Sequence, residues 1–154
     1  MVEFTLGDAS VTEQLGAAVA PLLRSGDAVL LYGGIGAGKS TLARALIRRL
    51  TRPDEDVPSP TFTLVQVYDS EPPVAHFDLY RLAHPDEVLE LGLDEALDAG
   101  AVVVEWPQRL GPRLPPDRLD IDLAEAGSGR RARLVPHGSW KGRRLDFRSL
   151  GFGS

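Results

Sequence analysis

Apolar residues along the first part of the chain predict a strand followed by a helix. A short strand is predicted over Val2–Leu6 (VEFTL). From Val11 to Leu23, apolar side chains recur every three or four positions, and this spacing predicts an amphipathic helix. Ser10 and Glu13 match a capping box at the start of that helix, and Ser25-Gly26 marks its end.

The remaining chain alternates between strand and helix patterns. Ala28–Tyr32 (AVLLY) is apolar throughout, which is typical of a strand buried on both faces. A glycine-rich loop follows, and a helix is predicted from about residue 40 to residue 50. Further strands are predicted at 61–69, 74–78, 101–105, 119–124 and 131–136, with helical segments across 85–100. This order indicates an α/β fold, with a mostly parallel sheet flanked by helices and antiparallel strands at its edge.

Length and composition suggest a single soluble domain. The chain has 154 residues, and we predict one domain over 1–136 and a flexible basic tail over 137–154. There is no cysteine, so a disulfide framework and a thiolate metal site are excluded. The first residues, MVEFTLGDAS, do not resemble a signal peptide, and no apolar run reaches the ~18 residues of a membrane span. A cytoplasmic protein without membrane contact is therefore expected.

The charges are unevenly distributed. The net charge of −5 argues against a general nucleic-acid binder. Six acidic residues and no basic one lie between Pro85 and Gly100, whereas seven basic residues and one acidic residue lie between Arg130 and Arg148. The first interpretation is solvated surface followed by a basic tail. The second is a docking surface, with the tail as the place for RNA contact.

The stretch Gly33–Ser40 (GGIGAGKS) matches the phosphate-loop pattern G-x-x-x-x-G-K-[ST] in full, between a predicted buried strand and a predicted helix. Glycines allow positive φ and turn successive N–H groups toward phosphate oxygens, and the helix N-terminus adds partial positive charge. Lys39 is expected to bridge the β- and γ-phosphates, and the Ser40 hydroxyl to bind Mg²⁺. Thr41 is placed to reach the α-phosphate.

Two acidic residues end predicted strands at the edge where open α/β sheets bind ligands. Asp78 ends VAHFD and Glu105 ends AVVVE. Either could hold Mg²⁺, directly or through water, and either could orient the attacking water. The alternative is an acid paired with a nearby arginine. His76, inside VAHFD, is expected to be a half-buried strand residue rather than a catalyst.

Several classes of phosphate-loop protein are excluded by what the sequence lacks. GTPases of the Ras type read guanine with an Asn-Lys-x-Asp segment, and this chain contains no asparagine. ABC-type ATPases need a Ser-Gly-Gly signature, which is missing. A small kinase is disfavoured because no lid insertion is evident. A minimal Mg²⁺-dependent ATPase remains, and an ATP-bound adaptor without required turnover and a small kinase stay as alternatives.

Four motifs in order and register resemble the TsaE family, from about Leu6 to Leu134: GGIGAGKSTLAR, SPTFTLVQVY, HFDLYRL and VVVEWPQRL. TsaE proteins are P-loop ATPases of bacterial tRNA threonylcarbamoyladenosine (t⁶A) biosynthesis. The resemblance implies a P-loop NTPase fold and slow ATP hydrolysis supported by the partner proteins TsaD and TsaB. It also implies an indirect role for tRNA, through modification of adenosine 37.

The same resemblance assigns site residues. With Gly33 and Thr41 from the phosphate-loop pattern, the nucleotide-binding set is Gly33, Ile35, Gly36, Ala37, Gly38, Lys39, Ser40, Thr41, Trp106 and Arg130. Thr61 resembles the family's switch-like threonine, Asp78 its Walker B-like acid and Glu105 its metal-linked acid. For Thr61 the alternative is a residue at the start of a strand. Trp106 could equally be a core anchor, and Arg130 could be solvated.

This chain departs from the usual family loop, Gly-Asp-Leu-Gly-Ala-Gly-Lys-Thr, at two positions that bear on the chemistry. Gly34 replaces the aspartate, which removes a negative charge near the γ-phosphate, and Ser40 replaces the threonine while keeping the hydroxyl. The first change puts in doubt a catalytic acid at position 34, but not nucleotide binding.

Overall fold

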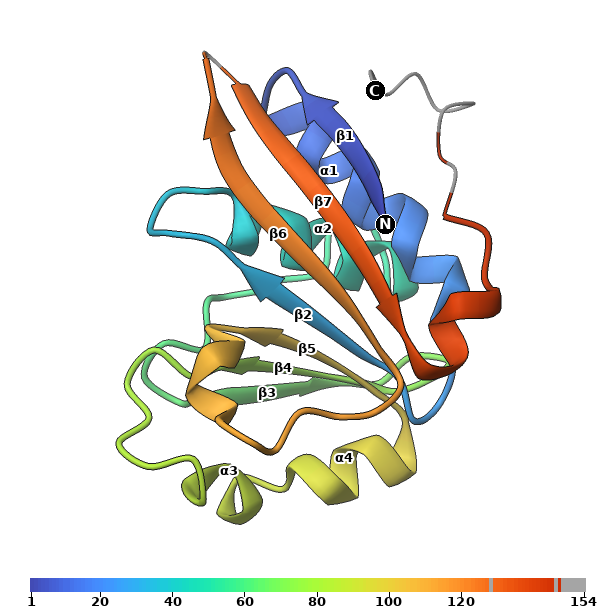
Figure 1. Ribbon diagram of the computed structural model, residues 1–154. Helices are drawn as coiled ribbons and strands as arrows, with labels where there is room; N and C mark the ends of the chain where they lie inside the picture. The colour runs from blue at the N-terminus through green and yellow to red at the C-terminus, as the bar shows by residue number, and fades with distance from the viewer. Residues whose placement is uncertain (128, 146, 148–154) are drawn as a thin grey trace.

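A computed structural model describes residues 1–127, 129–145 and 147, which fold around one seven-stranded sheet with the order β1-β7-β6-β2-β5-β4-β3 (Figure 1). The strands are β1 (Val2–Leu6), β2 (Ala28–Tyr32), β3 (Val65–Tyr68), β4 (Val74–Asp78), β5 (Ala101–Glu105), β6 (Arg118–Ala126) and β7 (Gly129–His137). Strands β4, β5, β2 and β6 run parallel, whereas β3, β7 and β1 pair antiparallel with their neighbours. The predicted α/β fold is confirmed.

Helices cover both faces of the sheet. Helix α1 (Ala9–Val19) packs on α2 (Lys39–Leu50) over one face, and the short helices α3 (Glu87–Glu90) and α4 (Leu93–Ala99) lie on the other (Figure 1). A Cβ on Gly16 would stand 2.5 Å from the carbonyl oxygen of Leu42, so only glycine permits this close approach of α1 to α2. In the described part of the chain, no helix has the length and apolarity to span a membrane.

The start and end of the first helix differ from the prediction. Asp8 is the N-cap, with an extended backbone (φ −154°), and its carboxylate accepts from the N–H of Val11 at 3.2 Å. Ser10 already lies inside the helix and donates its hydroxyl to Asp8 Oδ1 at 2.6 Å. The predicted N-cap is therefore wrong by two residues: Asp8 caps the helix instead of Ser10, and aspartate is as good an N-cap residue as serine. The α-helix ends at Val19 and continues as the 3₁₀ helix η1 (Ala20–Leu22), which contains Pro21.

The strand predicted over 61–69 is shorter in the structure. Residues 61–64 form a turn that the N–H of Leu64 closes by donating to the Pro60 carbonyl at 2.7 Å. Leu64 has φ 69°, a left-handed conformation that β-branched and other bulky residues seldom adopt. The alternating pattern persists through this turn, which is why it suggested a longer strand. The turn carries Thr61 away from the sheet ladder.

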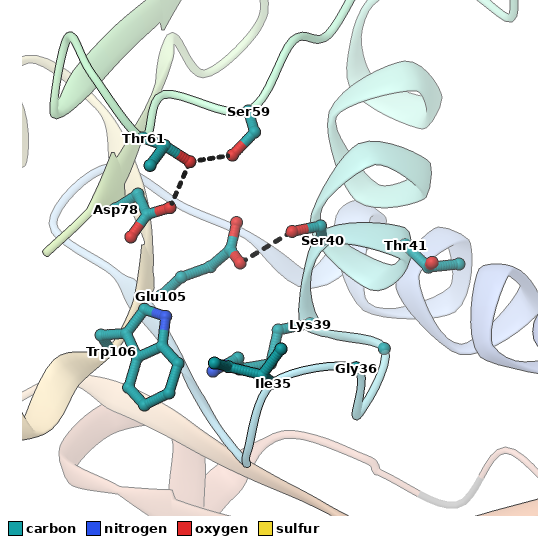
Figure 2. A pocket seen from close by; sticks show the side chains of 11 residues that line it. Ile35, Gly36, Lys39, Ser40, Thr41, Ser59, Thr61, Asp78, Glu105 and Trp106 are labelled. Carbon is teal, nitrogen blue, oxygen red and sulfur yellow. Dashed lines mark hydrogen bonds between the residues drawn. The ribbon is translucent and has the colours of Figure 1, made fainter. Parts of the chain in front are cut away.

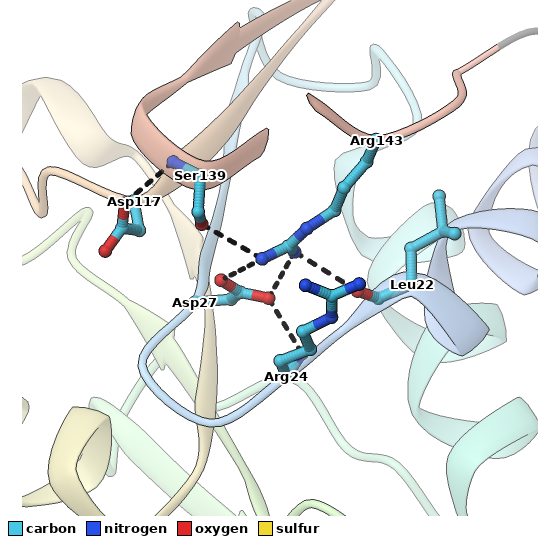
Figure 3. A network of polar contacts seen from close by, with 6 residues as sticks. All are labelled: Leu22, Arg24, Asp27, Asp117, Ser139 and Arg143. Carbon is cyan, nitrogen blue, oxygen red and sulfur yellow. Dashed lines mark hydrogen bonds and ion pairs between the residues drawn. The ribbon is translucent and has the colours of Figure 1, made fainter. Parts of the chain in front are cut away.

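Much of the segment predicted as a C-terminal tail packs on the domain. The 3₁₀ helix η3 (Gly138–Gly142) buries Trp140 completely, and Leu145 joins the same core cluster. Arg143 donates to the Asp27 carboxylate, to the Leu22 carbonyl at 3.1 Å and to Ser139 (Figure 3). The rest of the predicted tail, residues 146 and 148–154, lies outside the described residues.

Candidate nucleotide site

The glycine loop joins β2 to α2 at the carboxyl end of the parallel strands. Gly33, Gly36 and Gly38 all have positive φ (146°, 80° and 104°), as the motif requires. Gly33 has a second constraint, since a Cβ there would lie 2.7 Å from the backbone oxygen of Leu123. Gly38 is the residue from which α2 starts, so the N-terminus of a twelve-residue helix opens onto the loop. Backbone N–H groups at such a helix start favour an anion.

A pocket of about 290 Å³ opens above this loop (Figure 2). The structure brings together most of the predicted site residues, since its lining is Ile35, Gly36, Gly38, Lys39, Ser40, Thr41, Ser59, Thr61, Asp78, Glu105 and Trp106. Gly33 and Ala37 belong to the loop but are not part of the lining; Ala37 is buried beneath it. Arg130 approaches the loop from another side.

Lys39 is almost fully buried and is held by two groups that carry no charge. Its amino group donates to the Gly33 carbonyl at 2.6 Å and lies 3.3 Å from the centroid of the Trp106 ring. Burial lowers the pKa of Lys39, and the nearby carboxylates of Glu105 and Asp78 partly oppose that change. The surrounding groups therefore neutralise the positive charge of Lys39 only in part, and a bound anion would be stabilised there.

Ser40, Glu105 and His76 form a chain of hydrogen bonds that leads from the pocket into the core. The Ser40 hydroxyl donates to Glu105 Oε1 at 3.0 Å (Figure 2), and Glu105 Oε2 lies 2.7 Å from His76 Nε2. The side chains of Glu105 and His76 are only 3% and 2% exposed. His76 Nδ1 has no partner among the described residues, so the tautomer that satisfies the network carries its proton on Nε2. Both carboxylate oxygens of Glu105 are thus oriented.

The prediction that His76 is a half-buried strand residue was wrong in its burial, and the sequence had suggested no partner for this side chain. His76 is fully buried in β4, all of whose residues are buried, rather than half-buried. A signal was present in the sequence: a histidine in an otherwise apolar strand needs a polar partner, because an unpaired buried polar group is costly. The identity of that partner depends on the neighbouring strand β5, which sequence periodicity does not reveal.

Asp78 stands beside Glu105, because these two residues are register partners on the parallel strands β4 and β5. Asp78 Oδ1 accepts from the Tyr80 N–H at 3.1 Å, and Oδ2 accepts from the Thr61 hydroxyl at 3.3 Å. Ser59 and Thr61 share a further hydrogen bond of 2.8 Å (Figure 2). Thr61 therefore belongs to the turn before β3 and points into the pocket, and the alternative of a strand-start residue is wrong.

The donors around the pocket fit a hard divalent cation. The Ser40 hydroxyl and the carboxylates of Asp78 and Glu105 supply oxygen ligands only, which Mg²⁺ prefers. Both carboxylates are buried, and neither forms an ion pair with an arginine in the part of the chain that the structure describes. That part contains no group of three or more histidine, aspartate and glutamate side chains that could hold a metal ion by themselves. Phosphate and water oxygens would have to complete the coordination.

Trp106 forms one wall of the pocket. It has φ 58° and precedes the 3₁₀ helix η2 (Pro107–Leu110), and its ring packs against Tyr80 with centroids 4.9 Å apart. The ring also borders the core cluster beneath α3 and α4, so this tryptophan both packs against the core and lines the pocket. Strained backbone at a non-glycine residue is typical of functional sites.

Arg130 contacts the glycine loop from β7. Its guanidinium donates to the Gly36 carbonyl at 2.9 Å, although the pair is exposed. A second pocket of about 270 Å³ lies here and shares Gly36, Gly38 and Thr41 with the first. Its other lining residues are Gly7, Asp8, Ala9, Thr12, Gly129 and Arg130.

Gly34 is exposed, and a Cβ added there meets nothing within 4 Å, so the geometry does not demand glycine at this position.

Comparison with known proteins gives a consistent result. The family model for "Threonylcarbamoyl adenosine biosynthesis protein TsaE" matches residues 6–133. The chain is 42% identical over 117 residues to "tRNA threonylcarbamoyladenosine biosynthesis protein TsaE" of Streptomyces coelicolor, covering 73% of this chain and 78% of that one. Its counterpart of the same name in Rickettsia felis is 33% identical over 143 residues (92% and 84%). A crystal structure of Bacillus subtilis YdiB superposes with a TM-score of 0.76 at 27% identity, covering 91% of this chain and 88% of that one.

Proposed function

Since the chain belongs to the TsaE family of tRNA threonylcarbamoyladenosine biosynthesis, we propose that it is a Mg²⁺-dependent ATPase that supports this modification. One observation carries the proposal: a buried lysine, a helix N-terminus and two strand-end carboxylates converge on a single pocket. Cation and backbone donors suit a triphosphate, and the carboxylates suit its metal and the water that attacks it.

Lys39 is proposed to bind the β- and γ-phosphates. Its amino group donates to the Gly33 carbonyl and lies over the Trp106 ring. Phosphate oxygens offer a stronger, charge-assisted partner than either of these, so Lys39 would exchange them for phosphate on binding. The loop N–H groups and the first turn of α2 would surround the same oxygens, and Thr41 would reach the α-phosphate.

Ser40, Glu105 and Asp78 are proposed to hold Mg²⁺, whose positive charge would withdraw electron density from the γ-phosphate. Glu105 is oriented for this role at both oxygens, by Ser40 and by His76. Asp78 is held by Thr61 and by the backbone N–H of Tyr80, and it stands where a carboxylate can accept a proton from an attacking water. Thr61 is then the switch-like residue, because it links Asp78 to the exposed turn.

The second pocket is proposed to take the nucleoside. It continues from the first around Gly36, Gly38 and Thr41, and Asp8 and Arg130 supply polar side chains on its wall. Adenine is favoured over guanine because the guanine-reading segment of Ras-type GTPases is absent from the sequence. Trp106 would contact the phosphate end rather than the base, since it lines the first pocket and not the second.

Slow turnover by the isolated protein is also part of the proposal. Among the described residues that line the first pocket, Lys39 is the sole cation, so no arginine stabilises charge at the γ-phosphate. TsaD-like and TsaB-like proteins are the partners we propose to raise this rate, with tRNA as the indirect substrate. A rate for the isolated protein above ~10 s⁻¹, near the enzyme median, would contradict this part.

The phosphate assignment can be tested with the two lysines of the chain. Lys39→Ala is expected to weaken Mg²⁺-ATP binding at least ~10-fold and to abolish hydrolysis, because the triphosphate loses its cation. Lys141→Ala removes an exposed lysine of η3 and is the matched control. Calorimetric titration of both folded variants measures the difference. Equal ATP affinity for the two variants would rule out the assignment.

A further inference from the structure

Strand β3 leaves one edge of the sheet open. It is the last strand in the sheet order, next to α3 and α4, and pairs only with β4 (Figure 1). The N–H of Asp78 donates to the Leu64 carbonyl, which fixes the alternation of the antiparallel ladder. The backbone groups of Gln66 then face β4, whereas those of Val65 and Val67 face outward. In the described part of the chain no other strand pairs with this edge.

The edge lacks the features that usually prevent pairing with another chain. Such edges are normally blocked by lysine, proline or a bulge. The β3 sequence VQVY contains no charge and no proline, and Val67 is 71% exposed. An apolar groove of about 290 Å³ runs beside it, between β3, β4 and α4. Val65, Val67 and Phe77 form one side of the groove, and Leu91 and Ala96 form the other.

The charge around the groove is negative. Glu95 of α4 lines it directly, and Asp94 and Asp98 lie on the same short helix. Within the described residues, none of these three carboxylates forms an ion pair or a side-chain hydrogen bond. Not one basic residue occurs from Pro85 to Gly100. The uncompensated charge favours a basic occupant over a second copy of this chain, because β3 carries no lysine or arginine to meet Glu95.

We propose that the open edge of β3 and its groove dock an extended basic segment of a partner protein. The segment adds a strand to the sheet through the outward backbone groups of Val65 and Val67. Because side chains alternate along a strand, every second side chain faces the groove. An aliphatic side chain fits over Val67, and a lysine or arginine lays its apolar stem along the groove with its charge at Glu95. This site is separate from the nucleotide pocket and does not depend on ATP hydrolysis.

Two synthetic peptides test the proposal on the whole chain. Acetyl-Thr-Lys-Thr-Val-Thr-Lys-Thr-amide presents lysine, valine and lysine on one face, and its counterpart has glutamate in place of lysine. Amide shifts in ¹⁵N-labelled protein report binding. The lysine peptide is expected to shift the amides of Val65–Tyr68 and Glu95, and the glutamate peptide to leave them unchanged.

Two variants separate strand addition from simple charge attraction. Val67→Pro removes an outward N–H without removing a bond to β4, and it should lose the response while keeping its melting temperature. Glu95→Lys should lower the affinity for the lysine peptide roughly fivefold and allow the glutamate peptide to bind. Glu90→Lys, on α3 outside the groove, is the charge-matched control and should change binding less.

Three results would overturn the proposal. The first is no shift in β3 up to about 1 mM lysine peptide, a concentration that detects binding with a Kd of about 1 mM. The second is an unchanged response in Val67→Pro. The third is self-association through β3, seen as concentration-dependent shifts of Val65–Tyr68 and a dimer mass by light scattering, which would make a second copy the occupant.

Discussion

The ion pair between Arg143 and Asp27 makes residues 138–145 part of the fold, and removing it should be costly. The two side chains are 6% and 3% exposed. Arg143 donates to both oxygens of Asp27, to Leu22 and to Ser139, and it stacks on the buried ring of Trp140 at 4.3 Å. Arg143→Met keeps a long apolar side chain on Trp140 but, among the described residues, leaves the Asp27 carboxylate with only the Arg24 N–H as a donor.

The expected loss follows from that uncompensated carboxylate. Breaking a buried ion pair on one side costs about 3–5 kcal/mol. For a domain of this size such a loss lowers the melting temperature by roughly 10 °C. Urea unfolding gives the free energy of unfolding directly. Arg144→Met, which changes the exposed neighbouring arginine, is the matched control and should stay within about 0.5 kcal/mol of the parent.

A double-mutant cycle identifies the cause. Arg143→Met combined with Asp27→Leu removes both charges, so the double variant should be more stable than the sum of the single losses predicts, by roughly 1–3 kcal/mol. A loss below about 1 kcal/mol in Arg143→Met would mean that the pair is solvated, as surface pairs are. The ion pair would then not be what holds residues 138–145 on the domain.

Two further substitutions test the site's supporting residues. His76→Phe should lower the free energy of unfolding by about 1–3 kcal/mol, because Glu105 Oε2 is left buried without its donor. The combined His76→Phe and Glu105→Leu variant should recover part of that loss in the same urea experiment, and no recovery would contradict the pairing. Gly34→Asp, which restores the aspartate usual in the family, should change stability by less than about 0.5 kcal/mol because its Cβ meets no atom. A larger drop in melting temperature would show that position 34 needs glycine.

The sequence could predict those parts of the site that depend on neighbouring residues in the chain. The strand, glycine loop and helix around Lys39 are local, and the motif specifies each residue's conformation. Asp78 and Glu105 were identifiable because each ends an apolar run, and parallel strands bring their carboxyl ends to one edge of the sheet. These features identified residues that the structure brings together around one pocket.

The features that were missed depend on contacts between distant segments. His76 meets Glu105 only because β4 and β5 align Asp78 with Glu105, and no periodicity reports that register. The burial of Trp140 and the pairing of Arg143 with Asp27 join segments more than a hundred residues apart, so a basic composition alone suggested a solvated tail. The Asp8 cap was missed for a different reason, since two candidate caps lie two residues apart and local chemistry favours both.

Single-turnover phosphate release from Mg²⁺-ATP by Glu105→Gln is the decisive measurement for the proposed ATPase site. The substitution preserves the shape of the side chain but removes the charge that is oriented by Ser40 and His76. We expect a ~10²-fold or greater loss of hydrolysis, while ATP still binds through the glycine loop and Lys39. Phosphate release at the parent rate would contradict the proposed role of this carboxylate, and with it the assignment of the pocket as an ATPase site.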